Sequence, residues 1–483
     1  LSEQIKYKQE EISKLEELLK KYELPTIMNI SWEPTQIVNN KVYDGRVSFV
    51  VESKYSPVAE AYLIFTPRIY AHLPKEAFPE EFPRGYILTP VDGVFDENRE
   101  EFSVDITNIK GGREYDITAI PVNSLGMMNK GELPIPYIRE FENIAALDDI
   151  LVIATFYPWY TTNAWNSGES SWDWWAPYPK DRLPLLGKYN SCMREVISRH
   201  IDMATGFGID AFFVSWGFDN WGLYDRAVKI MMENELISDI KFAILYEKAG
   251  RLKIEPGSPF ADLSDGKNVR ILRSDFSYLG ETFMKHPSYL KIGNKCVFTI
   301  DASWGLRGNV KKAIDLVRED LAGKGVELYF LSDQVSAFSP NDPDQQKILE
   351  AADGITAYQV FQGPSDFWNP DPSQHSKFIE KFNEYTRERF NVWGDVARSM
   401  GIDFIPTGTT GFDRTLVSPG VPRLPKSVVL FEIQLKICKE YLDADVKAIN
   451  IVTFNEWFEN SATEPSLSEG FAYLQSLKRA LGL

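Results

Sequence analysis

The sequence predicts an α/β fold: a (β/α)8 TIM barrel over residues 147–483, preceded by a small all-β sandwich over 25–146 and a helix over 1–24. Three observations lead to this prediction. Apolar residues have a helical spacing up to Pro25, and alternate with a period of two as far as about residue 140. Short buried runs then alternate with helical patterns. A chain of 483 residues is long enough for two or three domains, or for one large barrel with an attachment.

The composition excludes several classes of function. Lys and Arg number 52 against 69 Asp and Glu, a formal net charge of -17, whereas a dedicated nucleic-acid binder needs a basic surface. The longest apolar runs are too short to span a membrane. The cysteines and histidines are few and scattered, so we expect no metal or other cofactor, and carboxylate chemistry is favoured. Because the chain begins at Leu1 rather than Met, we expect an upstream signal or anchor and a secreted or cell-surface protein.

Residues 3–23 combine many Lys and Glu with an apolar stripe that ends before Pro25. The stripe comprises Ile5, Ile12, Leu15, Leu19 and Tyr22. This pattern predicts a charged amphipathic helix. Barely three heptads are present, so packing of the helix on a neighbouring domain is favoured over a coiled-coil stalk.

The next region consists of short runs in which apolar and polar residues alternate, separated by turn signals such as Asp44-Gly45. The runs lie at 27–32, 46–51, 59–65, 102–106 and 115–119. Their number predicts an antiparallel sandwich, and residues 114–126 resemble the late strands of a fibronectin type III or immunoglobulin-like domain. No polar residues converge here, so we expect a structural spacer beside the catalytic part.

From about residue 149, eight short buried runs alternate with helix-like segments, which is typical of a (β/α)8 barrel with enlarged loops. The runs lie at 151–156, 211–214, 242–245, 297–300, 328–331, 354–357, 404–407 and 448–453. The helix-like segments include 193–205, 225–234, 310–321, 378–398, 427–442 and 468–481.

Barrel enzymes carry their chemistry at the C-terminal ends of the strands. Aromatic and acidic residues follow most of the eight runs, which indicates a cleft for a neutral polysaccharide or oligosaccharide. The candidate substrate-binding residues at these positions are Tyr157, Trp159, Tyr160, Trp216, Tyr246, Glu247, Asp301, Tyr358, Asn455 and Trp457. The first loop also holds Trp165, Trp172, Trp174 and Trp175. We expect about half of the tryptophans in this loop to form its own small core, and the others, with Trp175 as a candidate, to line the cleft.

Four motifs in order carry a family resemblance: Phe156-Tyr-Pro-Trp-Tyr160, Leu185-Leu-Gly-Lys-Tyr189 leading to His200, Gly208-Ile-Asp-Ala-Phe-Phe-Val-Ser-Trp-Gly217, and Phe454-Asn-Glu-Trp-Phe-Glu459 followed by Thr463-Glu-Pro465. Residues 150–483 resemble glycoside hydrolase family 99, the endo-α-mannosidases and endo-α-mannanases, and the related WbsX-like proteins of polysaccharide loci. The resemblance implies a retaining barrel glycosidase without a metal, whose acids match Glu456 and Glu459. It further implies that Glu459 is the general acid and then the base, and that Glu456 deprotonates the 2-hydroxyl of the sugar, which forms a 1,2-anhydro intermediate.

The residues leave other routes and substrates open. In the more common retaining mechanism one carboxylate attacks the anomeric carbon itself. Attack by O2 requires O2 to be trans to the leaving group, as in α-mannosides and not in α-glucosides. Phe458 and Asn460 replace the His and Gly that are usual in the family, and we expect this to reshape the adjoining subsite. An acid that is protonated at neutral pH also needs a raised pKa, which the other carboxylate and the rings of Trp457 and Phe458 are expected to supply.

The predicted function is therefore a retaining, endo-acting glycoside hydrolase of an α-linked glycan, with an α-mannan favoured. One alternative is an endo-α-glucanase or other α-glycan hydrolase. The second is a non-hydrolytic WbsX-like protein of surface polysaccharide or a glycan-binding protein. Retention of both glutamates favours catalysis, because a binding protein has no need of two desolvated acids three residues apart.

Overall fold

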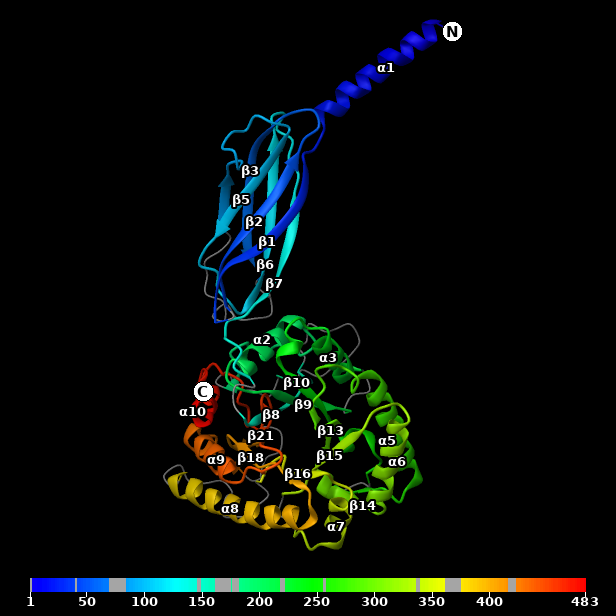
Figure 1. Cartoon of the computed structure of the whole chain (residues 1–483), viewed down its shortest axis with the longest axis vertical. Coiled ribbons are helices and arrows are strands. Elements are labelled where there is room, and N and C mark those ends of the chain that lie inside the picture. The colour runs from blue at the N-terminus through cyan, green and yellow to red at the C-terminus, as the bar shows by residue number, and fades with distance from the viewer. Residues whose placement is uncertain are drawn as a thin grey trace. The chain divides into compact units, whose positions relative to one another are not determined.

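The structure is a computed structural model, and it describes residues 2–39, 41–68, 84–145, 149–160, 175, 182–217, 222–254, 258–335, 339–360, 375–415 and 423–483. The chain divides into two compact units, Leu1–Glu142 and Asn143–Leu483. Figure 1 shows the strands and helices of both. Across the described ranges, no helix has the length and apolar character needed to cross a membrane.

The predicted amphipathic helix is present as α1 (Ser2–Lys21). Its apolar stripe differs from expectation, because Ile5, Ile12 and Leu19 each keep more than half of their surface exposed. Packing of the stripe on a neighbouring domain is therefore not found among the described residues.

The rest of the first unit is an antiparallel sandwich of two sheets, in the orders β1-β2-β5 and β4-β3-β6-β7. Its strands are β1 (Thr26–Val38), β2 (Lys41–Glu52), β3 (Val58–Pro67), β4 (Arg84–Leu88), β5 (Arg99–Ile106), β6 (Arg113–Asn123) and β7 (Gly131–Ile138). The sequence pattern missed β4 and β7, which lie at the two edges of their sheet. Two prolines interrupt the alternation in β7, and a proline is tolerated in a strand chiefly at a sheet edge.

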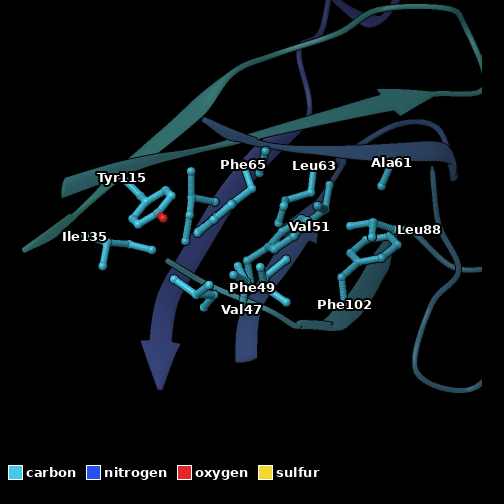
Figure 2. Close-up of a cluster of buried hydrophobic side chains, with 14 of the residues drawn as sticks. Val47, Phe49, Val51, Ala61, Leu63, Phe65, Leu88, Phe102, Tyr115 and Ile135 are labelled. Carbon is cyan, nitrogen blue, oxygen red and sulfur yellow. The ribbon is translucent and has the colours of Figure 1, made fainter. Parts of the chain in front are cut away.

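Alternation of apolar and polar residues builds the core between the two sheets. Val47, Phe49 and Val51 of β2 are almost completely buried, as are Leu63 and Phe65 of β3. Figure 2 shows these side chains together with those of Phe102, Tyr115 and Ile135 in one cluster.

The second unit is built around a curled parallel sheet in the order β17-β16-β15-β13-β10-β9-β8-β21-β18. These strands are β8 (Leu151–Phe156), β9 (Ala211–Trp216), β10 (Lys241–Tyr246), β13 (Lys295–Ile300), β15 (Leu328–Asp333), β16 (Gly354–Thr356), β17 (Asp403–Phe404), β18 (Thr407–Thr409) and β21 (Ala448–Val452). Seven of the eight predicted runs each coincide with one strand of this sheet, and the run 404–407 overlaps two, β17 and β18.

The two ends of the sheet are consecutive pieces of chain, which is why the sheet curls as in a TIM-like barrel. Only Ile405 and Pro406 separate β17 from β18. The Ile405 N–H donates to the Ile355 carbonyl at 2.9 Å, and the Pro406 carbonyl accepts from the Asn450 N–H, also at 2.9 Å. Because Pro406 has no N–H to donate, the predicted seventh strand is divided into two short pieces.

Helices follow the strands and surround the sheet (Figure 1). They are α2 (Arg194–Thr205), α3 (Leu223–Met232), α4 (Lys248–Arg251), α5 (Gly266–Thr282), α6 (Val310–Ala322), α7 (Pro343–Leu349), α8 (His375–Met400), α9 (Val428–Glu440) and α10 (Ala472–Leu481). Side-chain caps fix several of their starts: Asp265 accepts from the Lys267 N–H before α5, and Ser427 from the Leu430 N–H before α9. Short strands in the loops are β11 (Ala261–Asp262), β12 (Lys291–Ile292), β14 (Leu306–Arg307), β19 (Phe412–Asp413) and β20 (Arg423–Leu424).

Candidate active site

A small cavity identifies the inner face of the curled sheet. The strand residues that line it are Thr155, Phe213, Leu245, Thr299, Thr356 and Asn450, together with Asp301, Asp333 and Tyr358 near the strand ends. Successive residues of a strand point to opposite faces, so a residue two positions further along points the same way. This alternation brings Tyr157, Ser215, Glu247, Asp301 and Tyr358 to the inner side at the C-terminal ends of their strands.

The contacts among these residues agree with that placement. The Ser215 hydroxyl donates to Oε1 of Glu247 at 2.6 Å. The rings of Tyr157 and Tyr358 meet edge to face, with their centroids 6.4 Å apart. Burial raises the pKa of Tyr157 well above its usual range, and the negative charges of Glu247, Glu456, Asp301 and Glu459 raise it further. Tyr157 therefore lies amid the acidic residues of the site.

Two of the predicted substrate-binding residues, Trp216 and Tyr246, face away from the cavity. Trp216 and Tyr246 each lie one position after an inward-facing residue, so they point to the outer side, where the helices pack. The Tyr246 hydroxyl donates to Asp275 of α5 at 2.8 Å, and its ring lies 6.1 Å from that of Trp216. The ring of Trp216 stacks against Tyr278, also of α5. In the structure these two aromatics therefore face the helix layer and not the cavity.

The loop after β21 is tied back onto the strand end by backbone hydrogen bonds. Thr453 N–H donates to the Ser461 carbonyl at 3.0 Å, and Glu464 N–H donates to the Phe454 carbonyl at 2.7 Å. Asn460, where the resembled family has Gly, adopts a positive φ of 50°. This left-handed conformation favours glycine but is tolerated by asparagine, which explains how the fold-back survives the replacement.

The fold-back brings Glu456 and Glu459 to the mouth of the sheet. Glu456 is 1% exposed, and its Oε1 accepts from the Phe458 N–H at 2.7 Å. Glu459 keeps part of its surface exposed, and its Oε2 accepts from the Tyr358 hydroxyl at 2.9 Å. The backbone carbonyl of Glu459 accepts from the Asp413 N–H at 2.6 Å, which fixes the loop against the chain that follows β18.

Burial raises the pKa of both carboxyl groups. Burial raises the pKa of Glu456 well above its usual range, and the charge of Glu459 raises it further. Burial raises the pKa of Glu459 to about 7, although the hydrogen bond from Tyr358 and the charge of Arg414 act to lower it. Two neighbouring acids of this kind hold a proton between them near neutral pH. Glu459, being partly exposed, is the one that a bound molecule can reach.

A second group of ionisable residues follows β10, β13 and β15. Burial raises the pKa of Glu247, Asp301 and Asp333, the last to about 7. Lys248 is almost fully buried among them, and burial lowers its pKa, while the charges of Asp301 and Asp333 act to raise it. The sequence analysis chose Glu247 and Asp301 as candidates and left out Asp333 and Lys248, although Asp333 also follows a predicted strand.

Stacked aromatic rings form one wall beside the acids. Tyr157 stacks on Trp159 with their centroids 4.3 Å apart, and Trp159 remains partly exposed. Phe458 lies 6.0 Å from the ring of Trp159 and 6.2 Å from that of Tyr160. Phe458, which occupies the position of the family's usual His, therefore extends this apolar wall next to Glu459.

Asn455 joins the first strand end to the loop after β21. Its Oδ1 accepts from the Tyr157 N–H at 2.7 Å, and its Nδ2 donates to the Tyr157 carbonyl at 2.9 Å. The Tyr160 hydroxyl donates to the Asn455 carbonyl and accepts from the Trp457 N–H, each at 2.9 Å. Asn455 and Tyr160 are completely buried, and their hydrogen bonds hold the loop against the first strand end.

Glu464, which the sequence analysis did not include in the site, is the centre of a buried network under the loop. Its carboxylate accepts from Trp457 Nε1 at 2.8 Å, from the Tyr189 hydroxyl at 2.9 Å and from His200 Nε2 at 3.0 Å. Trp457 is therefore directed away from the cleft. A signal was present, because Tyr189, His200 and Glu464 all fall within the family motifs.

Other predicted features are buried or lie outside the described residues. Trp175 is completely buried, and its Nε1 donates to the Tyr189 carbonyl at 2.8 Å, so it belongs to the small core of the loop. Trp165, Trp172 and Trp174 lie outside the described residues. Within the part of the chain that is described, no group of three or more His, Cys, Asp or Glu has an arrangement that could hold a metal ion.

Comparison with known proteins gives one family match. The family described as glycosyltransferase WbsX matches residues 163–477. No curated protein sequence matches the chain.

Solved structures resemble the second unit in fold. A glycoside hydrolase-like protein is 19% identical, with 69% of this chain and 94% of that chain covered and a TM-score of 0.56. The GH99 endo-α-mannosidase from Bacteroides thetaiotaomicron, in complex with bis-tris propane, is 19% identical over 68% of this chain and 95% of its own, with a TM-score of 0.51. A second structure of that enzyme is 17% identical with the same coverage and a TM-score of 0.50. Together with the family match, these likenesses confirm the predicted resemblance to family 99 and to WbsX-like proteins.

Proposed function

The chain belongs to the WbsX glycosyltransferase family, and from this premise and its pair of buried acids we propose that it is a glycoside hydrolase. In this proposal it cleaves internal α-linkages of a polysaccharide or glycan with retention of configuration. A linkage of the α-mannan type is favoured, and the enzyme works outside the cell or at its surface. The observation that carries the proposal is the placement of Glu456 and Glu459 after the C-terminal end of β21, where Phe458 and Tyr358 hold their carboxyl groups and burial raises both pKa values.

The first step needs a carboxyl group that is still protonated at neutral pH, at which most carboxyl groups are ionised. Glu459 meets this need, because its pKa is raised to about 7 and its side chain is partly exposed. It gives its proton to the glycosidic oxygen as the bond to the anomeric carbon breaks. Tyr358 keeps the carboxyl oriented by donating to the other oxygen.

Glu456 assists from the opposite side of the pair. Burial and the charge of Glu459 raise its pKa, whereas the hydrogen bond from the Phe458 N–H favours the ionised form, so Glu456 acts as the base in the form of the pair in which Glu459 alone is protonated. It takes the proton of the 2-hydroxyl, and O2 displaces the leaving group to form the 1,2-anhydro sugar. Water then opens that ring at the anomeric carbon, losing its proton to Glu459, while Glu456 returns a proton to O2. Two inversions at the same carbon give retention.

The alternative retaining route has Glu456 attack the anomeric carbon directly and form a glycosyl ester. The two routes differ in the substrates that they permit. Only a sugar whose O2 is trans to the leaving group, such as an α-mannoside, can react through the anhydro intermediate. An α-glucan as the substrate would therefore favour the direct attack.

The test measures release of reducing ends from a panel of α-mannans and α-glucans by the native chain, Glu459→Gln and Glu456→Gln. We expect oligosaccharides from an α-mannan, and a loss of about 100-fold to 10,000-fold in rate for each variant, the range that a general acid or base supplies. Glu319→Gln is the matched control, because Glu319 is an exposed acid on α6. NMR of the first product formed should show the α-anomer. Unchanged rates in both active-site variants would refute the assignment of the acids.

The family description supplies a second candidate function, namely transfer of the sugar to another glycan instead of to water. The same acid pair serves both reactions, because a sugar hydroxyl can replace water in the second step. Longer oligosaccharides that form when acceptor is added in excess, without release of reducing ends, would favour the transferase.

A further inference from the structure

Lys248 is the buried cation of the site, and the function proposed above gives it no part. It follows Glu247 at the end of β10 and is only 3% exposed. Its ammonium lies over the Trp304 ring, 5.6 Å from the centroid. Lys248 Nζ would lie 3.4 Å from a Cβ added to Gly305. The side chain therefore extends from the end of β10 toward the turn that follows β13.

The ammonium has no direct polar partner. Over the described part of the chain, Lys248 makes no hydrogen bond and no ion pair within 4.0 Å, and Trp304 is the one contact recorded for its charge. Asp301 and Asp333 influence it electrostatically, yet neither reaches ion-pair distance. A nearby cation, Arg307, is already satisfied by Asp344 and by backbone carbonyls. A charged group on a side chain that is only 3% exposed is costly unless water or a bound molecule satisfies it, so the ammonium is available to a ligand.

The surroundings indicate the chemistry of that partner. Asp301 and Asp333 both line the inner cavity, beside Tyr358, whose hydroxyl contacts Glu459. An oxygen between the ammonium and the Asp301 carboxylate would need to accept from the first and donate to the second. A hydroxyl group does both, whereas a carboxylate or sulfate only accepts and would be repelled by the surrounding acids.

We propose that Lys248 is a substrate-binding residue which, together with Asp301, holds a hydroxyl group of a neutral sugar in the cleft. The ammonium donates to the hydroxyl oxygen, and the hydroxyl donates to Asp301. Selectivity for a neutral hexose over a uronate follows from the excess of carboxyl groups around the lysine. The inference rests on the proposed function, because it assumes that the ligand of the cleft is a glycan.

The experiment separates binding from turnover by using the Glu459→Gln background. Calorimetric titration with neutral α-mannan and α-glucan oligosaccharides gives the affinity, and the matching uronate oligosaccharides test the selectivity. We expect Lys248→Met to weaken binding of the neutral sugar at least tenfold, and Lys248→Gln to weaken it less because its amide still donates. Lys311→Met, which removes an exposed lysine of α6, is the control and should leave the affinity unchanged.

Thermal unfolding distinguishes a binding residue from a structural one. Removing a buried, unpaired charge should leave the melting temperature of Lys248→Met unchanged or raise it, while affinity falls. An unchanged affinity and a lower melting temperature in Lys248→Met would overturn the proposal. Tighter binding of the uronate than of the neutral sugar would also overturn it, as would the failure of every neutral oligosaccharide to bind. If neutral sugars bind in a way that depends on Lys248 but the native chain hydrolyses none of them, the proposed hydrolysis is refuted and the role of Lys248 in binding stands.

Discussion

Replacing Glu459 with glutamine should make the protein more stable at pH 8 and leave its stability nearly unchanged at pH 4.5. The pKa of Glu459 is about 7 in the folded chain and near the ordinary 4.5 when the chain is unfolded. The folded chain therefore binds more protons between these pH values. Its stability falls as pH rises through this window, because the buried carboxyl must then ionise.

The size of the effect follows from the same difference. At about 1.36 kcal/mol per pH unit, raising the pKa from 4.5 to about 7 corresponds to a ceiling of about 3.4 kcal/mol. Glu459 is partly exposed and shares its titration with Glu456, so we expect roughly 1–3 kcal/mol. Unfolding of the second unit, about 340 residues, has an entropy of roughly 0.7 kcal/mol/K. The melting temperature should therefore rise by about 1–4 °C in Glu459→Gln at pH 8.

Differential scanning calorimetry at pH 4.5 and pH 8, with a fixed scan rate, measures this shift for the transition of the second unit. Glutamine retains an oxygen that can accept from Tyr358, so the hydrogen bond survives the substitution. Glu319→Gln should show no such dependence on pH, because Glu319 is an exposed residue of α6. A gain of equal size at both pH values would refute the reasoning, since it could not come from ionisation of Glu459. A lower melting temperature at pH 8 would show that the ionised carboxylate is stabilised.

Three further predictions test other parts of the site. Tyr358→Phe removes a hydrogen bond that holds the pKa of Glu459 down, so the alkaline limb of the pH–rate profile should move up by roughly half to one pH unit, and an unmoved limb would contradict this. Tyr246→Phe should destabilise the protein by about 1 kcal/mol without changing KM, because its hydroxyl contacts Asp275 in the helix layer; a raised KM would return Tyr246 to the cleft. Glu464→Gln should lower kcat more than it raises KM and reduce stability by about 1–3 kcal/mol, because an amide cannot accept from all three donors around it. The same loss of stability with an unchanged kcat would limit Glu464 to a structural role.

The sequence alone determined where the strands of the curled sheet lie. A parallel strand that is buried on both faces is a short apolar run, and eight such runs correspond to strands of the curled sheet. The choice of Glu456 and Glu459 as the acids came from the family resemblance. The information on the strands is local, because burial selects residue types within a few positions of one another.

The direction of each strand-end side chain was decided by the tertiary structure. Ser215 and Glu247 face inward, whereas Trp216 and Tyr246 next to them face the helices, because the phase of the alternation depends on how the sheet curls. When both faces of a strand are apolar, its sequence does not show which of its residues face inward.

The network around Glu464 also required the fold. Its members come from the first loop, from α2 and from both ends of the loop after β21, and they meet only when the first and last strands pair. The same is true of Lys248, whose chemistry arises from burial next to Asp301 and Asp333 of neighbouring strands. Sequence by itself determined the elements and the chemical groups of this protein. Only the tertiary structure decided which groups face one another, because that depends on contacts between residues far apart in the chain.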